Sequence, residues 1–406
     1  MKKDWKWFLT IFLPKLPIFI LFLPVVILMR CLRPILWIQL FPIDYRIGHT
    51  AAEPDTYLLE KKFEAQPSRA KIIFFPLRPT KINQQLVKMW SRVLPVSTCG
   101  YWVDWVNMEI PGGKAHQYQL RPQLTRDINH LTYRNPPPVA FTPREEEQGE
   151  ALLRSMGIPK GAPFVCIHGR DSAFLDHHVP GADWAYHNYR DFSIGNFALA
   201  AQELVRRGYY VIRIGRLVKE KFPITDTKVI DYANSHFRSD FADIYLIAKC
   251  QFFVGQSGIE SVARLFRKPI VYTNFIPIGY LHTWSSSFLS IVKLLKNKKE
   301  NRLLSFKEML HPDIRHAYDT KEFESRGLEV IENSPEEVCD AVVEMEERLK
   351  LQWKTTDEQE ELQRQFWKGF PFDTGIHGEN KSRVGSLFLE KYRFLMTEMM
   401  SNPIER

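Results

Sequence analysis

The stretch from residue 240 to 279 constrains the fold more than any other part of the chain. It reads DFADIYLIAKCQ, FFV, GQSG, then an apolar helical pattern ended by Lys268-Pro269, then IVY. This order predicts helix, strand, turn, helix and strand. Because the strand between the helices is short and wholly apolar, it is typical of a parallel sheet covered on both faces.

The turn after this strand has two interpretations. It consists of Gly255, Gln256, Ser257 and Gly258. Unpaired N–H groups at a helix start, approached closely through glycine, favour a phosphate. Alternatively, Ser257 is only the N-cap of the helix. Glu260, one turn later, either holds a sugar or ribose hydroxyl or simply favours the helix N-terminus.

Strands and helices alternate from residue 162 onward. Apolar runs at 163–167, 209–214, 229–232 and 252–254 are separated by helical patterns at 192–207 and 240–249. This alternation predicts a doubly wound parallel sheet of the nucleotide-binding kind. The Pro136–Pro138 run marks a domain boundary. The predicted divisions are 1–43, 44–142, 143–350 and 351–406, the last forming tail helices, with a return onto the domain before 143 as one option.

Ligands of open parallel sheets bind beyond the carboxyl ends of the strands. Arginine offers paired donors to phosphate oxygens and glycine lets the backbone come close, so a diphosphate explains the polar residues found there. These candidates are His168, Gly169, Arg170, Asp171, Arg213, Gly215, Gln256, Ser257, Gly258, Glu260 and Ser261. Ordinary structural roles stay open for His168 as a hydrogen-bonded histidine, for Asp171 as the partner of Arg170, and for Arg213 as a solvated strand end.

Residues 5–42 are the most apolar part of the chain, interrupted by basic residues and prolines. The cleanest run, 16–29, would be roughly 21 Å long as a helix, short of the roughly 30 Å of a bilayer core. Extending it backward would bury Lys15, which is costly. We expect a proline-broken monotopic or re-entrant membrane anchor with Trp5, Trp7 and Trp37 at the interface, and a single span or a buried soluble helix as alternatives.

The region between this segment and the proline run predicts a small α/β domain. Strands are expected at 71–75 and 96–99, and a helix at 83–93. A further helix should begin at Thr142-Pro143 and run to Met156, with glutamates in its first turn. The loop 172–191 is long and aromatic, which is typical of a functional lid.

The composition of the chain limits the kinds of partner that it can bind. The 406-residue chain carries a net charge of +8, which suits an anionic membrane surface or an anionic substrate. We find no zinc finger, aromatic RNP-like set or basic helix, and therefore expect no nucleic acid. The five cysteines are scattered without a C-x-x-C pair, which indicates reduced thiols. His177, His178 and His187 match no metal signature, so no metal is expected.

The order H-G-R-D after a strand, R-I-G at the next strand end, and DIYLIAKCQFFVGQSGI resembles bacterial glycosyltransferases of the GT-B fold, which have two Rossmann-like domains. The last piece is similar to the heptosyltransferase pattern, and the His-x-Arg start is similar to fucosyltransferases. The chain as a whole looks most like putative glycosyltransferases of surface-polysaccharide synthesis. The likeness covers 143–277 well and the N-terminal half weakly. Heptosyltransferases have Asp where this chain has Gln256, and fucosyltransferases have a second arginine where it has Asp171.

The resemblance implies an α/β, GT-B-like enzyme that moves a sugar from a nucleotide-diphosphate donor to a lipid-linked or polysaccharide acceptor, with inversion, without a metal and without a cofactor. Residues 44–142 would form the acceptor-side domain and 143–350 would bind the nucleotide sugar. Arg170 would neutralise the leaving diphosphate, Ser257 and Gly258 would contact it, and Arg213 and Glu260 would line the site. The enzyme would work at the cytoplasmic face of the inner membrane.

The residues by themselves leave three questions open. The acceptor needs a general base, and the candidates are Asp104, Glu109, His116 and Asp171. A pyruvyl- or phospho-transferase and a non-catalytic nucleotide-sugar-binding protein are alternatives to the glycosyltransferase. A membrane-anchored protein that binds anionic polymer through a basic face is a further alternative, and it would show steep salt dependence.

Overall fold

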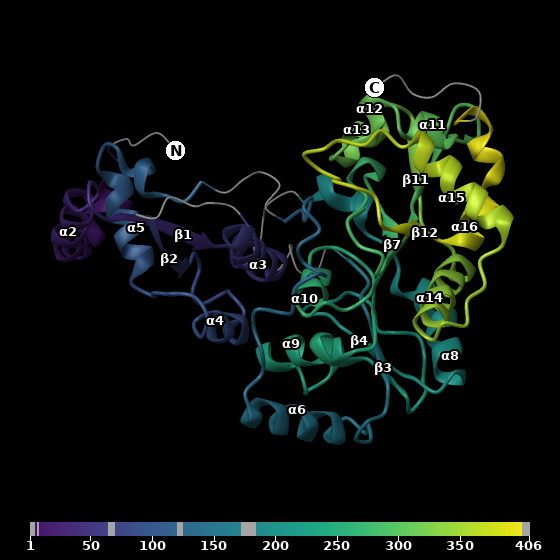
Figure 1. Ribbon diagram of the computed structural model, residues 1–406, viewed down its shortest axis with the longest axis horizontal. Coiled ribbons are helices and arrows are strands. Elements are labelled where there is room, and N and C mark those ends of the chain that lie inside the picture. Colours follow the sequence, from purple (N-terminus) through teal and green to yellow (C-terminus); the bar gives the residue numbers. More distant parts are fainter. Residues whose placement is uncertain (1–4, 6–7, 64–69, 120–124, 172–183, 400–406) are drawn as a thin grey trace. The chain divides into compact units, whose positions relative to one another are not determined.

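The computed structural model describes residues 5, 8–63, 70–119, 125–171 and 184–399. The chain divides into two compact units (Figure 1). The first unit comprises Met1–Thr125 with Pro138–Ala140, and the second comprises Arg126–Pro137 with Phe141–Arg406. The predicted tail 351–406 belongs to the second unit.

The first unit is built on two parallel strands, β1 (Trp37–Ile43) and β2 (Ala70–Pro76), in which Leu40 lies opposite Ile73. Helices surround the pair. They are η1 (Phe8–Phe12), η2 (Leu13–Lys15), α2 (Leu16–Cys31), α3 (Ile47–Phe63), α4 (Gln84–Trp90), α5 (Gly100–Glu109) and η3 (Gly113–His116).

One sequence expectation in this unit differs from the structure. The strand expected at 96–99 is wrong, because Val96 makes a single bridge to Phe74 and the chain then turns into α5. Pro95 lacks an N–H group and cannot continue a ladder. Trp37 begins β1, and its indole Nε1 donates to the Ala115 carbonyl at 3.0 Å.

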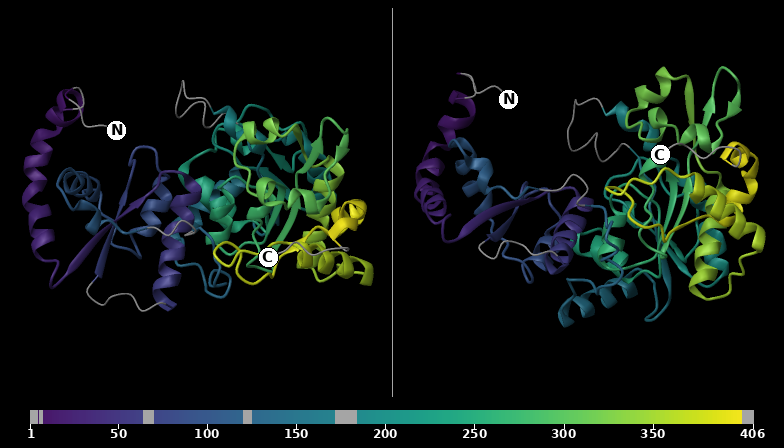
Figure 2. Two further views of the ribbon diagram at one scale, coloured as in Figure 1. Left: turned by 90° about the horizontal axis from the view of Figure 1, so that it is seen from above. Right: turned by 45° about the horizontal axis from the view of Figure 1, so that its top comes forward.

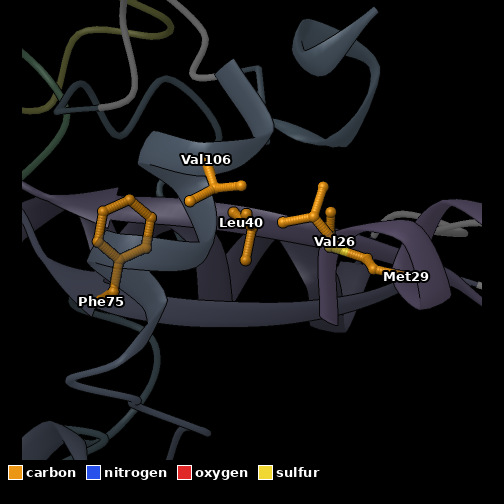
Figure 3. Close-up of a cluster of buried hydrophobic side chains, with 5 residues drawn as sticks. All are labelled: Val26, Met29, Leu40, Phe75 and Val106. Carbon is orange, nitrogen blue, oxygen red and sulfur yellow. The ribbon is translucent and has the colours of Figure 1, made fainter. Parts of the chain in front are cut away.

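Helix α2 is fixed to this unit by a small apolar core (Figure 3). Val26 and Met29 of α2 are buried against Leu40 of β1, Phe75 of β2 and Val106 of α5. Burying side chains of this size contributes about 1.5–3 kcal/mol each. The C-terminal half of α2 is therefore part of the folded unit.

Arg30, near the end of α2, adds a polar clamp to this core. Its guanidinium donates to the Asn107 side chain at 3.0 and 2.9 Å and to the backbone carbonyls of Asn107, Ile110 and Pro111 at 2.8, 3.1 and 2.8 Å. These carbonyls lie at the C-terminal end of α5, where acceptors are unpaired and the helix dipole favours a cation. The clamp thus joins the two helix ends.

The second unit contains a seven-stranded sheet in the order β12-β8-β7-β6-β3-β4-β5, and each neighbouring pair is parallel. Counted from β3, the first six strands follow the Rossmann order 3-2-1-4-5-6. The strand order therefore reverses between β3 and β6. The α/β fold class with a parallel sheet is confirmed. The strands are β3 (Phe164–Ile167), β4 (Tyr210–Arg213), β5 (Val229–Ile230), β6 (Phe253–Val254), β7 (Ile270–Phe275), β8 (Phe288–Val292) and β12 (Arg383–Val384).

Helices cover both faces of this sheet, with α8 and α14 on one side and α6, α9 and α10 on the other (Figure 1). A small antiparallel sheet of β9 (Leu294–Asn297), β10 (Arg302–Leu303) and β11 (Leu328–Ile331) adjoins it. The helices are α6 (Pro143–Ser155), η4 (Ala185–Arg190), η5 (Ile194–Phe197), α8 (Ala198–Arg206), η6 (Tyr232–Asn234), α9 (Asp240–Lys249), α10 (Glu260–Leu265), η7 (Ile278–Tyr280), α11 (Phe306–Met309), α12 (Pro312–Arg315), α13 (Thr320–Ser325), α14 (Pro335–Leu349), α15 (Asp357–Gly369), α16 (Ser386–Lys391) and η8 (Arg393–Met399).

Local sequence signals account well for α6 and α9. Thr142 and Glu145 form a capping box at the start of α6, with Pro143 at the first helical position. The Ser239 side chain caps α9 by accepting from the Ala242 N–H. The two helices pack closely because Gly149 of α6 faces the ring of Tyr245, where an added Cβ would lie 1.9 Å from Cζ.

We expect Gly149→Ala to destabilise the second unit by about 1–3 kcal/mol, because a rigid buried ring would have to move. Equilibrium denaturant unfolding measures the change. Gln148→Ala, at an exposed position of the same helix, is the matched control and should stay within about 0.5 kcal/mol. Equal stability of the two variants would contradict this account of the α6–α9 contact.

Candidate functional site

The strand ends that carry the predicted site residues meet at the point where strand order reverses. Ile167, the last residue of β3, lies opposite Val254 of β6 on one side and Arg213 of β4 on the other. The segments that follow these strands therefore leave the sheet side by side. Ligands of doubly wound folds bind at this position.

His168 and Ser257 come together across this switch point. The His168 Nε2 lies 3.1 Å from the Ser257 Oγ, and its Nδ1 lies 3.0 Å from the Ile214 carbonyl. Since a carbonyl only accepts, Nδ1 carries the proton and Nε2 accepts from the Ser257 hydroxyl. Burial lowers the pKa of His168 to about 4, and the nearby charges of Arg213 and Arg170 act in the same direction. The imidazole is therefore neutral at neutral pH.

The turn that carries Ser257 has a backbone found mainly in glycine. The φ angles of Gly255, Ser257 and Gly258 are +125°, +109° and +108°. A Cβ on Gly255 would lie 2.3 Å from the His168 carbonyl oxygen, so only glycine fits there. Ser257 has no such freedom, and strained non-glycine residues of this kind cluster at functional sites.

The Glu260 carboxylate pairs with a backbone N–H group of this turn. Its Oε2 accepts from the Gly258 N–H at 2.5 Å, and the side chain is buried. Burial raises the pKa of the Glu260 carboxyl. A phosphate that used the Gly258 N–H would have to displace this carboxylate, which is a feature that the sequence did not reveal.

Arg170 is held in place beside the switch point. Its Nε donates to the Asp191 Oδ1 at 2.9 Å, and its side chain is 11% exposed. Burial lowers the pKa of the Arg170 guanidinium and raises that of the Asp191 carboxyl, so desolvation outweighs their attraction. Lys293, directly after β8 and 2% exposed, donates to the backbone carbonyls of Tyr189 and Asp191 at 3.1 and 2.5 Å.

The remaining candidates around β3 and β4 make mostly internal contacts. Arg213 is 1% exposed, which excludes the solvated strand end, and its Nη1 donates to the Glu220 carbonyl at 2.8 Å and to the Asp231 Oδ1 at 3.1 Å. Asp171 accepts from the Lys219 N–H at 2.8 Å.

Close packing explains several of the small residues. A Cβ on Gly169 would approach the Ile194 side chain at 2.8 Å, and one on Gly215 would approach Val218 at 2.8 Å. Gln256 is buried, and its Nε2 donates to the Asn274 carbonyl at 2.5 Å. Ser261, on α10, donates its N–H to the Gly258 carbonyl at 3.1 Å.

Sequence reasoning missed Lys293, because the apolar run 288–292 before it was not recognised as a strand. The strand-end rule that selected Arg170 would have selected Lys293 as well. His177 and His178 lie outside the described residues. Among the residues that the structure describes, no group of three or more His, Cys, Asp or Glu side chains suits a metal.

Three candidates for the general base lie in the first unit. Asp104 of α5 accepts from the Gln117 Nε2 at 3.0 Å, and burial raises its pKa. Glu109 ends the same helix. The Nδ1 of the buried His116 lies 2.8 Å from the Ile38 carbonyl, which ties it to β1.

No protein-family model and no curated protein matches the sequence. Solved structures similar to this chain include ADP-heptose LPS heptosyltransferase II from E. coli, with 14% identity, 58% of this chain and 84% of that chain covered, and a TM-score of 0.32. A glycosyl transferase of family 9 from Veillonella parvula has 9% identity, 59% and 80% coverage, and a TM-score of 0.33. The iron-containing heptosyltransferase TibC of E. coli, in complex with ADP-D-beta-D-heptose, has 12% identity, 58% and 57% coverage, and a TM-score of 0.31. These neighbours are glycosyltransferases.

The buried neutral His168 predicts a loss of stability in acid. Its pKa is about 4 in the folded protein against 6.5 for an unperturbed histidine, so the unfolded chain binds more protons between these pH values. The free energy of unfolding should therefore fall as the pH is lowered from 6.5 to 4. His168→Asn, which keeps a donor for the Ile214 carbonyl, should reduce this fall.

Denaturant unfolding at several pH values measures the effect. The pKa values of His187 and His377 are also lowered to about 4, so the fall should be reduced and not abolished. His311→Asn, at an exposed position, should leave the pH dependence as in the unsubstituted protein. An unchanged pH dependence in His168→Asn would contradict the buried neutral state.

Proposed function

We propose that this protein is a glycosyltransferase that moves a sugar from a nucleoside-diphosphate donor to a lipid-linked or polysaccharide acceptor, with inversion and without a metal. The observation that carries the proposal is the meeting of His168, Ser257 and Arg170 at the strand-order switch of a Rossmann-like sheet. Buried cations and glycine-bounded backbone at this position suit a diphosphate.

In the proposed reaction, an acceptor hydroxyl attacks the anomeric carbon, and the bond from that carbon to the diphosphate oxygen breaks. The electron pair leaves with the nucleoside diphosphate, whose developing charge Arg170 stabilises without reorganisation, because Asp191 already fixes the guanidinium. The acceptor proton passes to a carboxylate or histidine base. Asp104, Glu109, His116 and Asp171 remain the candidates.

The hydrogen bond to His168 limits the role that Ser257 can have within this proposal. The Ser257 hydroxyl already donates to His168 Nε2, so its oxygen can only accept a further hydrogen bond. It therefore suits a sugar or ribose hydroxyl better than a phosphate oxygen. Arg170 then becomes the principal side-chain donor to the diphosphate.

The main alternatives differ in what is transferred. A pyruvyl- or phospho-transferase would turn over a different donor, and a non-catalytic protein would bind the nucleotide sugar without turnover. A panel of nucleoside diphosphates and their sugars, tested for a rise in melting temperature and then for product, separates these cases.

Arg170→Ala should lower turnover by at least about a hundredfold, since a donor aimed at developing charge is removed. Product formation from the donor found in the panel measures the effect. The melting temperature of the variant should stay close to that of the unsubstituted protein. Arg206→Ala, whose side chain is 70% exposed, is the matched control and should retain full activity. Full turnover in Arg170→Ala would rule out the diphosphate assignment.

We also propose that the protein is a monotopic membrane protein bound through α2. Phe8–Cys31 is the one stretch in the described residues that is long and apolar enough, by length and composition, to cross a membrane. Ile20, Leu21 and Leu28 of α2 are 62%, 68% and 59% exposed, and α2 lies along one side of its unit (Figure 2). The Arg30 clamp and the Val26–Met29 core oppose a full crossing, because a helix that left the unit would lose both.

Two features favour the cytoplasmic face. All five cysteines are free, among them Cys166 and Cys250, which are buried close together, as is usual in a reducing compartment. The net charge of +8 attracts the anionic lipids of a cytoplasmic leaflet.

Replacing Leu21 and Leu28 together with Glu should lower binding to anionic vesicles by at least about tenfold, because apolar surface no longer enters the bilayer. Co-sedimentation with vesicles measures the bound fraction. Leu351→Glu, at a position of the second unit that is 93% exposed, is the control. Unchanged binding in the double variant would contradict the α2 anchor.

A further inference from the structure

A second group of polar side chains lies on β7 and the segment after it, and it has no part in the proposed transfer. Tyr272 comes from β7, and His282 and Trp284 follow η7. The ring centroids of Tyr272 and His282 are 4.7 Å apart, and those of His282 and Trp284 are 4.6 Å apart. The three rings therefore form a continuous row.

Each of these rings carries a buried polar atom without a hydrogen-bond partner among the described residues. The atoms are the Tyr272 hydroxyl, the His282 Nδ1 and the Trp284 Nε1. Tyr272 is 1% exposed and Trp284 is 2% exposed. Buried polar groups are almost always paired, because an unpaired one loses its hydrogen bonds to water without gaining others in the protein. Three in one row indicate that something is bound there.

Two arginines lie against the same row. The guanidinium carbons of Arg126 and Arg264 are 5.6 Å and 5.9 Å from the centroid of the Trp284 ring. The Arg126 Nη1 donates to the Tyr280 carbonyl at 2.7 Å. Burial and then the charge of Arg264 lower the pKa of Arg126 to about 10. Two like charges are thus held close together in a poorly hydrated place.

Glu260 is an acidic group that interacts with this row. Burial raises the pKa of the Tyr272 hydroxyl and the charge of Glu260 raises it further, while the charge of Arg264 acts on Glu260 in turn. One carboxylate offsets one of the two guanidinium charges. A positive charge remains. The Trp284 Nε1 can only donate a hydrogen bond, and the Tyr272 hydroxyl can donate one.

We infer that the row of Tyr272, His282 and Trp284 with Arg126 and Arg264 is a binding site for a small oxyanion, a carboxylate or phosphate group. The Trp284 N–H can only donate, and both arginines only donate. An acceptor with negative charge complements all of them at once. A water molecule would pair with the N–H and O–H groups but carries no charge to offset the guanidinium of Arg126.

The oxyanion site is separate from the diphosphate site at β3 and β6. The two are joined through α10, which begins at Glu260 beside the Gly258 turn and carries Arg264 four residues later, about 6 Å along the helix axis. An acidic group of a substrate is one occupant that this spacing allows. The oxyanion site does not rest on the transferase proposal.

Isothermal titration of the full chain in detergent tests the inference with inorganic phosphate and with glucuronate, and with glucose as the neutral control. Phosphate, glucuronate or both should bind, and glucose should not. The ligand that binds shows whether the acidic group is a phosphate or a carboxylate. Trp284→Phe keeps the ring but removes the N–H, and should weaken binding on the order of tenfold.

Trp353→Phe is the matched control, because the Trp353 Nε1 is also buried without a partner and Arg348 lies 5.4 Å from its ring. It should bind as the unsubstituted protein does. Absence of binding by both anions would overturn the inference and indicate bound water only. Equal weakening by the two tryptophan variants would overturn it too. Loss of binding in Arg170→Ala with retention in Trp284→Phe would place the anion at the diphosphate site instead.

Discussion

The candidate diphosphate site depends on how closely the end of β6 can approach the end of β3. Gly255 makes this approach with φ at +125°, at a place where any Cβ would meet the His168 carbonyl oxygen at 2.3 Å. The Ser257 hydroxyl reaches His168 Nε2 at 3.1 Å because these two segments of the chain meet there. The turn also sets Gly258 and Glu260 at the start of α10. The backbone freedom of one residue therefore positions the side chains that the proposed chemistry uses.

The second unit contains several largely buried cations. Arg170 and Lys293 are fixed by Asp191 and by backbone carbonyls, and Arg126 and Arg264 lie beside the Trp284 ring. Desolvation lowers the pKa of Arg170, Lys293 and Arg126. Folding alone gains little from cations in such places. A bound anion, as we propose for both sites, would restore the interactions that burial removed.

The structure of the first unit explains how its apolar N-terminal segment accommodates basic residues. Its length and composition suit a membrane span, whereas its prolines and basic residues do not. Arg30 would be costly inside a bilayer, but here it binds the carbonyls at the end of α5. Lys15 lies 5.4 Å from the Trp105 ring, another partner supplied by the same unit. One side of α2 thus belongs to the protein core, and the other side is exposed.

Much of the local structure could be predicted from the sequence, because its signals are local. Apolar periodicity, the Thr142 capping box and the glycine-bounded turn specify α6, α9 and the start of α10 without reference to the rest of the chain. The pairing of His168 with Ser257, the Glu260 carboxylate on the Gly258 N–H, and the place of Lys293 could not be predicted in the same way. These contacts depend on strand order, on the register of β3 against β6, and on which donor a carboxylate reaches first. By itself the sequence determined the elements and the residues at their ends. The tertiary structure alone decided which of those ends meet, because residues 89 positions apart in the chain become neighbours only when the sheet is assembled.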